Sequence, residues 1–382
     1  MQSCDHGKAK NGKKYHNNRK ERDTMKLLDC IYRIPEITEK ITENRKENFA
    51  PLIQYLGTDI ETLDEILFVG SGTSNTSAVT ACRFVEEVSG ISAATILPNE
   101  FLSKVSYNPK ALYVFTSQSG TSTLALECQK LVKDKGLRHV GLTANTENPM
   151  AKAVDVHVEL GCGYEEYGMR TIGYNASVQT LMFMGMEIGL AKGYLSQFRY
   201  DELITEVKKV PASHKEICEK SLAWFDSNKG KLMAYESFAV YGSKANWGVA
   251  LEGALKILEM AKRHLCVGYE MDDGLHGPTM GFTDKIGVII LSDGGKDDKM
   301  TMGLADFGKA EFNSAHIIGV HTRDGLDLPF EAKGGAFHAL EFAATVQVLS
   351  YRLAIDYGIE LVQTKDRDPN AKRYFNTHSG GL

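Results

Sequence analysis

Residues 112–124, LYVFTSQSGTSTL, decide the predicted fold of this chain. Their apolar first half has the character of a buried strand, and the amphipathic stretch 125–136 that follows has the character of a helix. Between the two lies a turn rich in serine and threonine. Unpaired N–H groups at a helix N-terminus attract anions, and hydroxyl groups add further donors. The segment is therefore typical of a phosphate-binding loop, although serines that only cap a helix would look the same.

A second stretch, residues 66–90, repeats this design. Its strand-like ILFVG leads into the hydroxyl-rich turn SGTSNTS and then into another helix-like segment. Two such units predict an open parallel sheet in which both turns line one crevice at the carboxyl ends of the strands. The turn lacks the third glycine of a dinucleotide-binding fingerprint, which favours a monophosphate ligand over a dinucleotide.

Length and composition limit the class of protein. The chain has 382 residues, of which 43% are hydrophobic, so it can bury a large core and is expected to form two domains. Its formal net charge of −5 argues against nucleic acid as a partner. Seven cysteines without a C-x-x-C pair predict neither disulfides nor zinc, which fits a reducing cytoplasm. No apolar run is long enough to span a membrane.

The strand and helix patterns alternate along the chain and then start again. Strand-like runs at 66–70, 92–98, 111–117, 139–145 and 154–160 are separated by amphipathic segments, which predicts a parallel sheet covered on both faces. Similar runs recur about 170 residues later. The sequence therefore predicts an α/β protein with two tandem flavodoxin-like, three-layer αβα domains.

The predicted domain organisation has five parts. Residues 1–24 are polar and basic and are expected to form a disordered arm, and residues 25–56 a helical arm interrupted at Pro35. The first domain spans 57–197 and the second spans 198–360. Residues 361–382 form a C-terminal tail. Only the first domain keeps the hydroxyl-rich turns, whereas the second carries aspartates at the equivalent place, so the first is expected to bind the phosphate.

Charged residues in the second half are candidates for catalysis. In residues 251–262, LEGALKILEMAK, Glu252, Lys256 and Glu259 are spaced i, i+4 and i+7, which predicts one helical face for all three. The three leucines of this stretch are expected to form the buried face. A solvent-exposed, salt-bridged face is the commoner explanation of such spacing and stays an alternative. His276, in a Gly-Leu-His-Gly-Pro loop, is suited to acid–base chemistry near neutral pH.

These motifs together resemble a known family. VGSGTSNTS, TSQSGTS, ALEGALKILE and LHGP are similar to the motifs of the double SIS-domain phosphosugar isomerases, over roughly residues 45–360. That family includes the isomerase half of glucosamine-6-phosphate synthase, deglycases of fructoselysine and glucoselysine 6-phosphates, and glucosamine-6-phosphate deaminases. The resemblance implies a set of residues that bind the phosphate and the sugar: Thr73, Ser74, Ser117, Gln118, Ser119 and Ser122.

The resemblance also implies catalytic roles. Glu259 is similar to the glutamate that moves a proton between C1 and C2, and Lys256 to its electrostatic partner. His276 resembles the histidine that opens the sugar ring, often supplied by the adjacent subunit, which implies a homodimer or larger homo-oligomer with shared active sites. Lys372 in the tail loosely matches a lysine that reaches the substrate. No metal ion and no organic cofactor are implied.

The choice of substrate depends on a departure from the family pattern. Arg170 stands where small residues close over the sugar in the synthase, and it can either contact an anionic substrate or pair with Glu165 or Glu166. The chain is too short to include an ammonia-supplying domain, which favours cleavage of a C–N bond. The sequence thus predicts a deglycase or deaminase acting on a 6-phosphorylated amino sugar or Amadori adduct. The alternatives are a plain aldose–ketose isomerase and a non-catalytic sugar-phosphate sensor.

Overall fold

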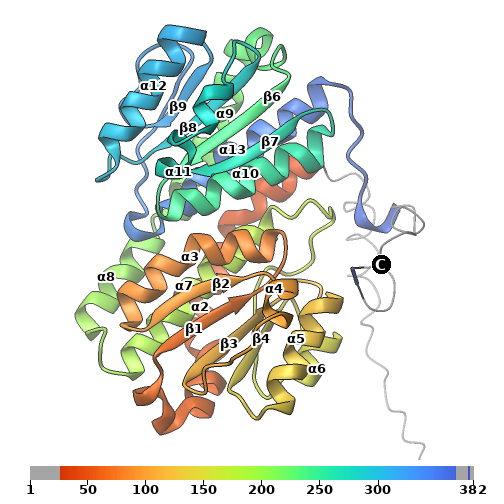
Figure 1. Ribbon diagram of the computed structural model, residues 1–382, viewed down its shortest axis with the longest axis vertical. Helices are drawn as coiled ribbons and strands as arrows, with labels where there is room; N and C mark the ends of the chain where they lie inside the picture. Colours follow the sequence, from red (N-terminus) through yellow and green to blue (C-terminus); the bar gives the residue numbers. More distant parts are fainter. Residues whose placement is uncertain (1–25, 367–376, 379–382) are drawn as a thin grey trace, which may run out of the picture.

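The computed structural model describes residues 26–366 and 377–378. The predicted arm at 1–24 and the candidate Lys372 lie outside the described residues. The described part contains two parallel sheets, one above the other in Figure 1, with helices packed between them and on their outer faces. The architecture predicted from the alternating pattern is confirmed.

The first sheet follows the order β2-β1-β3-β4-β5. All its strand pairs are parallel, with Val69 of β1 beside Phe115 of β3. Because helices cover both faces of the sheet, its central strands β1 and β3 are nearly continuous apolar runs. The strands are β1 (Glu65–Val69), β2 (Ser92–Ile96), β3 (Ala111–Thr116), β4 (His139–Thr143) and β5 (His157–Glu159).

The second sheet repeats this topology. Its order, β7-β6-β8-β9-β10, is the same pattern of strand neighbours, and every pair is again parallel. The repeated order confirms that the recurring sequence pattern reflects two similar α/β units. The strands are β6 (Ser237–Gly242), β7 (Leu265–Glu270), β8 (Ile286–Ser292), β9 (Ala315–Gly319) and β10 (Leu328–Pro329).

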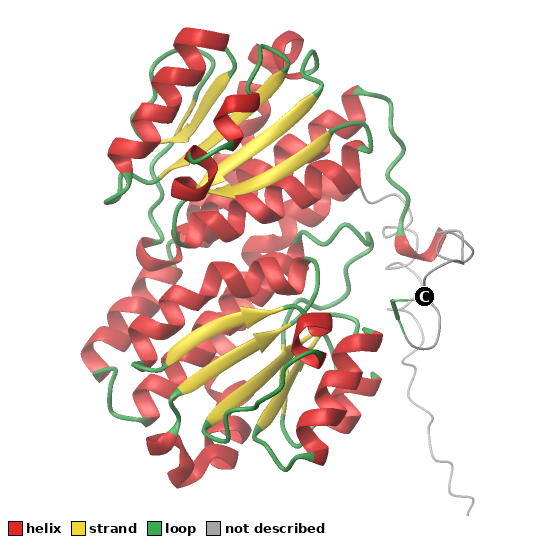
Figure 2. Ribbon diagram, in the orientation of Figure 1, coloured by secondary structure: helices red, strands yellow, loops and turns green. Residues whose placement is uncertain are grey.

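Helices cover both faces of both sheets, as Figure 2 shows. In the first unit these are α2 (Leu27–Leu56), α3 (Thr73–Ser89), α4 (Pro98–Leu102), α5 (Thr123–Asp134), α6 (Pro149–Ala153) and α7 (Ile172–Ala191). They are followed by α8 (Gln197–Val207), α9 (Val210–Leu232), α10 (Ala245–Ala261), α11 (Met271–Leu275), α12 (Asp298–Phe312) and α13 (His338–Asp356). Among the described residues, no helix is both long and apolar enough to cross a membrane.

Alternate residues of each strand point to different cores. Ile66 and Phe68 of β1 face a large core that α2, α3 and α7 share with α9, α10 and α13, whereas Leu67 and Val69 face α4, α5 and α6. The outer face of the second sheet is covered by α11 and α12. One continuous apolar layer of helices therefore joins the two sheets.

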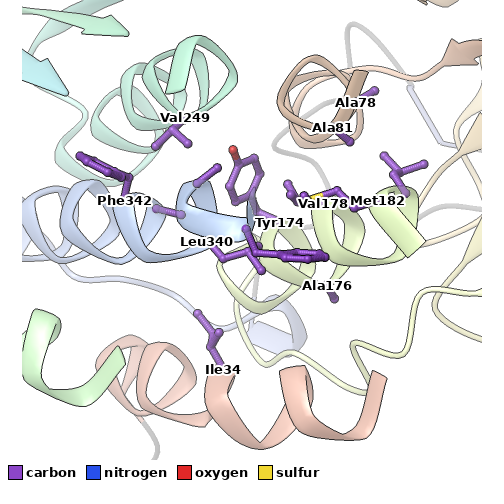
Figure 3. Close-up of a cluster of buried hydrophobic side chains, with 14 of the residues drawn as sticks. Ile34, Ala78, Ala81, Tyr174, Ala176, Val178, Met182, Val249, Leu340 and Phe342 are labelled. Carbon is purple, nitrogen blue, oxygen red and sulfur yellow. The ribbon is translucent and has the colours of Figure 1, made fainter. Parts of the chain in front are cut away.

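Close contact between helices α3 and α10 sets the geometry of this layer. A Cβ atom at Gly248 of α10 would lie 2.5 Å from the backbone nitrogen of Thr80 in α3, so only glycine fits at this crossing. Figure 3 shows Val249 and Phe342 on one side and Ala78 and Ala81 on the other, with the ring of Tyr174 between them. The tight crossing brings the amino-terminal end of α3 within reach of polar side chains on α10.

Two local predictions differ from the structure. Helix α2 is continuous from Leu27 to Leu56 and passes through Pro35, where an interruption was expected. An internal proline costs about 3 kcal/mol, but the buried side chains of α2 pack along its whole length and offset this cost. The expected loop at 274–278 is also not a loop throughout, because its first two residues end helix α11 and its last begins a short 3₁₀ helix.

Candidate active site

The two hydroxyl-rich turns lie side by side at the carboxyl edge of the first sheet. They follow β1 and β3, which are hydrogen-bonded neighbours at the point where the strand order reverses. Ligands of open α/β sheets bind at this type of switch point. The turn after β1 leads directly into α3, so Thr73 and Ser74 occupy its first turn, at the positive end of the helix dipole. The Ser74 N–H donates to the Ser71 carbonyl at 3.2 Å, which leaves the Ser74 hydroxyl as its donor for an anion.

Hydroxyl groups organise the turn after β3. Ser117 Oγ lies 2.9 Å from Ser122 Oγ and accepts a hydrogen bond from the Gly120 N–H at 3.2 Å. Gly120 has a φ of +65°, and a Cβ there would lie 1.8 Å from Oδ1 of Asn148. Glycine is therefore required at this position, both for the backbone conformation and for the close approach of Asn148.

The remaining polar residues of this turn have identifiable partners. Ser119 Oγ lies 2.8 Å from the Thr121 hydroxyl and accepts from the Thr121 N–H at 3.3 Å. Gln118 donates from Nε2 to Glu165 Oε2 at 3.3 Å. The buried Glu165 also accepts backbone hydrogen bonds from the first turn of α7, which holds the Gln118 side chain against a fixed acceptor.

The charged face of α10 is buried. The side chains of Glu252 and Lys256 have 0% exposure, whereas Leu258 of the same helix is 45% exposed. The expectation that the leucines form the buried face is wrong, and so is the alternative of a solvated charged face. The reason is tertiary, because α10 packs its polar side against the amino-terminal end of α3.

Lys256 is the centre of this polar group. Its Nζ lies 2.6 Å from Glu259 Oε2 and 3.3 Å from Glu252 Oε1, and it donates to the Thr73 hydroxyl at 3.2 Å. Thr76 donates to Glu252 Oε2 at 2.5 Å. The candidate base Glu259, 33% exposed, is thus connected through one lysine to the turn after β1.

Burial and charge affect the two buried groups in different ways. Burial raises the pKa of Glu252 above its ordinary value, although Lys256 partly opposes this effect. Burial alone would lower the pKa of Lys256, but Glu252 and Glu259 more than offset it, so the net direction is upward. Lys256 therefore stays a cation beside Glu259 at neutral pH, and it can hold that carboxylate in one orientation.

His276 is not brought to this group within the chain. It follows α11, its side chain is 75% exposed, and it contacts Asp272. The hydrogen bond to the Asp272 carbonyl, with the Asp272 charge, raises the pKa of His276. Among the described residues no hydrogen bond joins it to Glu259, Lys256 or the turns, so the structure does not bring this candidate together with the others.

Arg170 adopts the pairing with Glu165. Its Nη1 lies 4.0 Å from Glu165 Oε2 and donates to the carbonyls of Glu165 and Tyr167, both at 3.2 Å. Glu166 pairs with Arg33 at 2.8 Å instead. Glu165 also contacts Gln118, so it lies between Arg170 and the turn after β3. The Arg170 side chain is 26% exposed.

The equivalent edge of the second sheet is nearly filled. The turns after β6 and β8 enclose a cavity of about 10 Å³, enough for about one water molecule. Asp297 lies 3.5 Å from Lys244, and Asp293 lies 3.3 Å from His338. A cavity of this size is too small for a sugar phosphate, and the binding of phosphate by the first unit stays a prediction.

Three contributors to this region were missed from the sequence. Thr76 lies one turn after Thr73 on the same face of α3, so helical spacing could have predicted that both hydroxyls contact the same group, Glu252. Glu165 was expected only as a partner of Arg170, and its contact with Gln118 had no signal in the sequence. His378 was also missed: its Nδ1 lies 3.2 Å from Thr121 Oγ1, and the neighbouring Thr377 carbonyl accepts from the Thr123 N–H at 3.0 Å.

Comparisons with known proteins agree with this architecture. No protein-family model matches the chain. Over 357 residues it is 23% identical to glutamine–fructose-6-phosphate aminotransferase (isomerizing) of Tropheryma whipplei strain Twist, a match that covers 88% of this chain and 56% of that protein. The chain therefore spans little more than half the length of that curated relative.

Solved structures share the whole fold. A proposed phosphosugar isomerase from Clostridium difficile 630 superimposes with a TM-score of 0.83 at 22% identity, covering 92% of this chain and 99% of that one. Glucosamine-6-phosphate deaminase from Thermotoga maritima gives a TM-score of 0.65 at 24% identity, covering 86% and 96%. Together with the repeated sheet order and the paired turns, these likenesses agree with the resemblance drawn from the motifs and show that the chain shares the two-unit fold of these proteins.

Proposed function

We propose that the protein is an enzyme that acts on a 6-phosphorylated amino sugar or Amadori adduct. In this proposal it moves a proton between C1 and C2 of the sugar and releases an amine by hydrolysis of the C–N bond. The observation that carries the proposal is the link from Glu259 through Lys256 to Thr73. It places a partly exposed carboxylate next to a turn suited to phosphate.

The substrate would lie between the two turns and α10. The phosphate would accept hydrogen bonds from N–H and hydroxyl groups of Ser74, Ser119 and Ser122, while Ser117 and Gln118 would contact the phosphate or the sugar. A phosphate fixed at one end of the sugar holds C1 and C2 at a constant distance from it. The exposed part of Glu259 would then face these two carbons.

The proposed chemistry needs a base and an acid. For a 1-amino-1-deoxyketose, Glu259 would remove a proton from C1, the electron pair of that C–H bond would form the C1–C2 double bond, and an acid would protonate the C2 oxygen. Glu259 would return its proton to C2 while the nitrogen lone pair forms the C1=N bond, leaving a protonated imine, and loss of the N–H proton to the conjugate base of the acid would restore that acid. Water then hydrolyses the imine to an aldose phosphate and a free amine.

Lys256 and His276 have separate parts in this proposal. Lys256 would hold the Glu259 side chain in one orientation, because its Nζ lies 2.6 Å from the Glu259 carboxylate. His276, which is exposed and away from this group in the single chain, would act as the acid in the active site of a second copy. The proposal therefore includes a homo-oligomer in which active sites are shared between chains.

Arg170 is the residue proposed to favour an anionic substrate. Its side chain is partly exposed and lies 4.0 Å from Glu165, and Glu165 in turn contacts Gln118 of the turn after β3. A guanidinium there would attract the carboxylate of an amino acid joined to the sugar. Arg170→Ala should weaken binding of fructoselysine 6-phosphate more than binding of fructose 6-phosphate. Arg170→Lys, which keeps the charge, serves as the matched control.

The function is tested by incubating the purified protein with four compounds: glucosamine 6-phosphate, fructoselysine 6-phosphate, glucoselysine 6-phosphate and fructose 6-phosphate. Free amine, ammonia and hexose phosphates are then measured. Release of an amine or ammonia from at least one adduct is the expected result. Conversion of fructose 6-phosphate without any amine release would instead indicate a plain isomerase. Tight binding of these compounds without turnover would indicate a sugar-phosphate sensor.

A further inference from the structure

The end of the chain contacts the turn proposed to bind phosphate. His378 Nδ1 lies 3.2 Å from Thr121 Oγ1, which in turn lies 2.8 Å from Ser119 Oγ. Ser122 and His378 also form an antiparallel bridge, and the Thr123 N–H donates to the Thr377 carbonyl. Backbone pairing therefore fixes the imidazole next to a chain of two hydroxyl groups that ends at Ser119.

The direction of the hydrogen bonds in this chain decides what Ser119 can offer to a ligand. If Nδ1 carries a hydrogen, it donates to Thr121, whose hydroxyl hydrogen can then point to Ser119 Oγ. Ser119 keeps its own hydrogen for another acceptor. If Nδ1 carries no hydrogen, the Thr121 hydroxyl donates to the imidazole and accepts from the Ser119 hydroxyl. The only hydroxyl hydrogen of Ser119 is then used within the turn.

A bound phosphate needs the first of these arrangements. Its oxygens are acceptors, so Ser119 contributes only when its hydroxyl hydrogen points to the ligand. Ser119 Oγ already accepts from the Thr121 N–H at 3.3 Å and has a second lone pair for the Thr121 hydroxyl. Both acceptor positions of Ser119 are then filled from within the turn, and its donor is directed outward.

We propose that His378 is a positioning residue of the phosphate site, which acts through Thr121 to hold Ser119 as a hydrogen-bond donor. This inference rests on the proposed function, because it requires a phosphate at the turn after β3. It gives His378 and Thr377 a role in substrate binding that neither the spacing of the motifs nor the candidate residues indicated.

Titration calorimetry of the full chain with fructose 6-phosphate tests this inference. His378→Ala and Thr121→Val each interrupt the chain of hydrogen bonds and should weaken binding by about 3- to 10-fold. His378→Asn should restore most of the affinity, because its amide nitrogen takes the place of Nδ1 and can donate. In a Ser119→Ala background, His378→Ala should have almost no further effect.

His321→Ala serves as the control, because this exposed histidine belongs to the second unit and pairs with Asp298. It should leave the affinity unchanged. Unchanged or tighter binding by His378→Ala would overturn the inference, and tighter binding would show that the tail competes with the ligand. The inference would also be overturned if His378→Ala weakened binding equally in the parent and in the Ser119→Ala background. Failure of His378→Asn to restore the affinity would overturn it as well.

The outcomes separate this inference from the proposed function. If the parent protein binds no fructose 6-phosphate, both are wrong. If the parent binds it and His378→Ala binds equally well, only the role of His378 is wrong. If binding depends on His378 as expected but no amine is released from any adduct, the positioning role stands and the proposed chemistry fails.

Discussion

Lys256 and Thr73 are 183 residues apart in the chain, yet the ammonium group of the lysine donates to the threonine hydroxyl at 3.2 Å. The lysine comes from the helix that follows β6, and the threonine from the turn that follows β1. Because the same lysine lies 2.6 Å from Glu259, this contact connects the candidate base of one α/β unit with the candidate anion site of the other.

Replacing Glu259 with glutamine should remove the base and keep the shape of the side chain. Exchange of solvent deuterium into C1 or C2 of a bound phosphosugar, followed by NMR, should fall by at least ~10² if Glu259 is the general base. Glu87→Gln, an exposed position on α3, is the control. Exchange that persists in Glu259→Gln would assign the base elsewhere.

Ser119→Ala and Ser74→Ala should each raise the KM for a 6-phosphosugar. A hydrogen bond to a charged group contributes about 1.5–3 kcal/mol, so each loss corresponds to a KM increase of about one to two orders of magnitude. Ser103→Ala, where an exposed hydroxyl donates to the Asn99 carbonyl, should have no effect on KM. Steady-state kinetics with unchanged circular dichroism would check the prediction, and unchanged KM values would mean that the phosphate site is misplaced.

Lys256→Met should destabilise the protein strongly. It leaves the buried Glu252 without its cation, and breaking a buried ion pair in this way costs about 3–5 kcal/mol. Denaturant unfolding gives the free energy. Lys208→Met, at an exposed position on the surface, should change it by less than about 0.5 kcal/mol.

A second variant separates charge from packing at this position. Adding Glu252→Gln to Lys256→Met removes the unpaired buried charge and should recover part of the lost stability, so the two effects should not be additive. Additive losses would show that packing dominates over the ion pair.

Acid should destabilise the fold through buried histidines. Burial lowers the pKa of His214 from 6.5 to about 4, and the hydrogen bond from its Nε2 to the Ile31 carbonyl only partly opposes this. Between pH 6.5 and 4 the unfolded chain binds a proton that the folded chain does not, so stability falls as the pH decreases. The loss from this residue approaches about 3 kcal/mol near pH 4.

The measurement is the free energy of unfolding between pH 7 and 4.5 for the parent and His214→Asn. The substitution removes the titrating group, so the variant should lose less stability over this range, whatever its stability at pH 7. Parallel pH profiles for the two proteins would contradict the assignment. His316 has its pKa lowered to about 4 for the same reason, so a smaller slope should remain in the variant.

The fold class and the places of the two hydroxyl-rich turns were predictable from local sequence. Apolar runs such as 66–70 and 111–117 are buried on both faces, so their composition alone identifies them as strands of a covered parallel sheet. Once those strands are adjacent, the turns that follow them must meet at one edge. Local sequence was sufficient here because strand burial and turn chemistry are properties of short segments.

The burial and the partners of the charged residues depend on the tertiary structure. The spacing of Glu252, Lys256 and Glu259 placed them on one face of α10, but burial of that face followed from Gly248, which lets α10 pack tightly against α3. For the same reason the contact of Gln118 with Glu165 and the contact of His378 with Thr121 were not predictable. These contacts join segments far apart in the chain, and their energies depend on distances and solvent exclusion that no local pattern encodes.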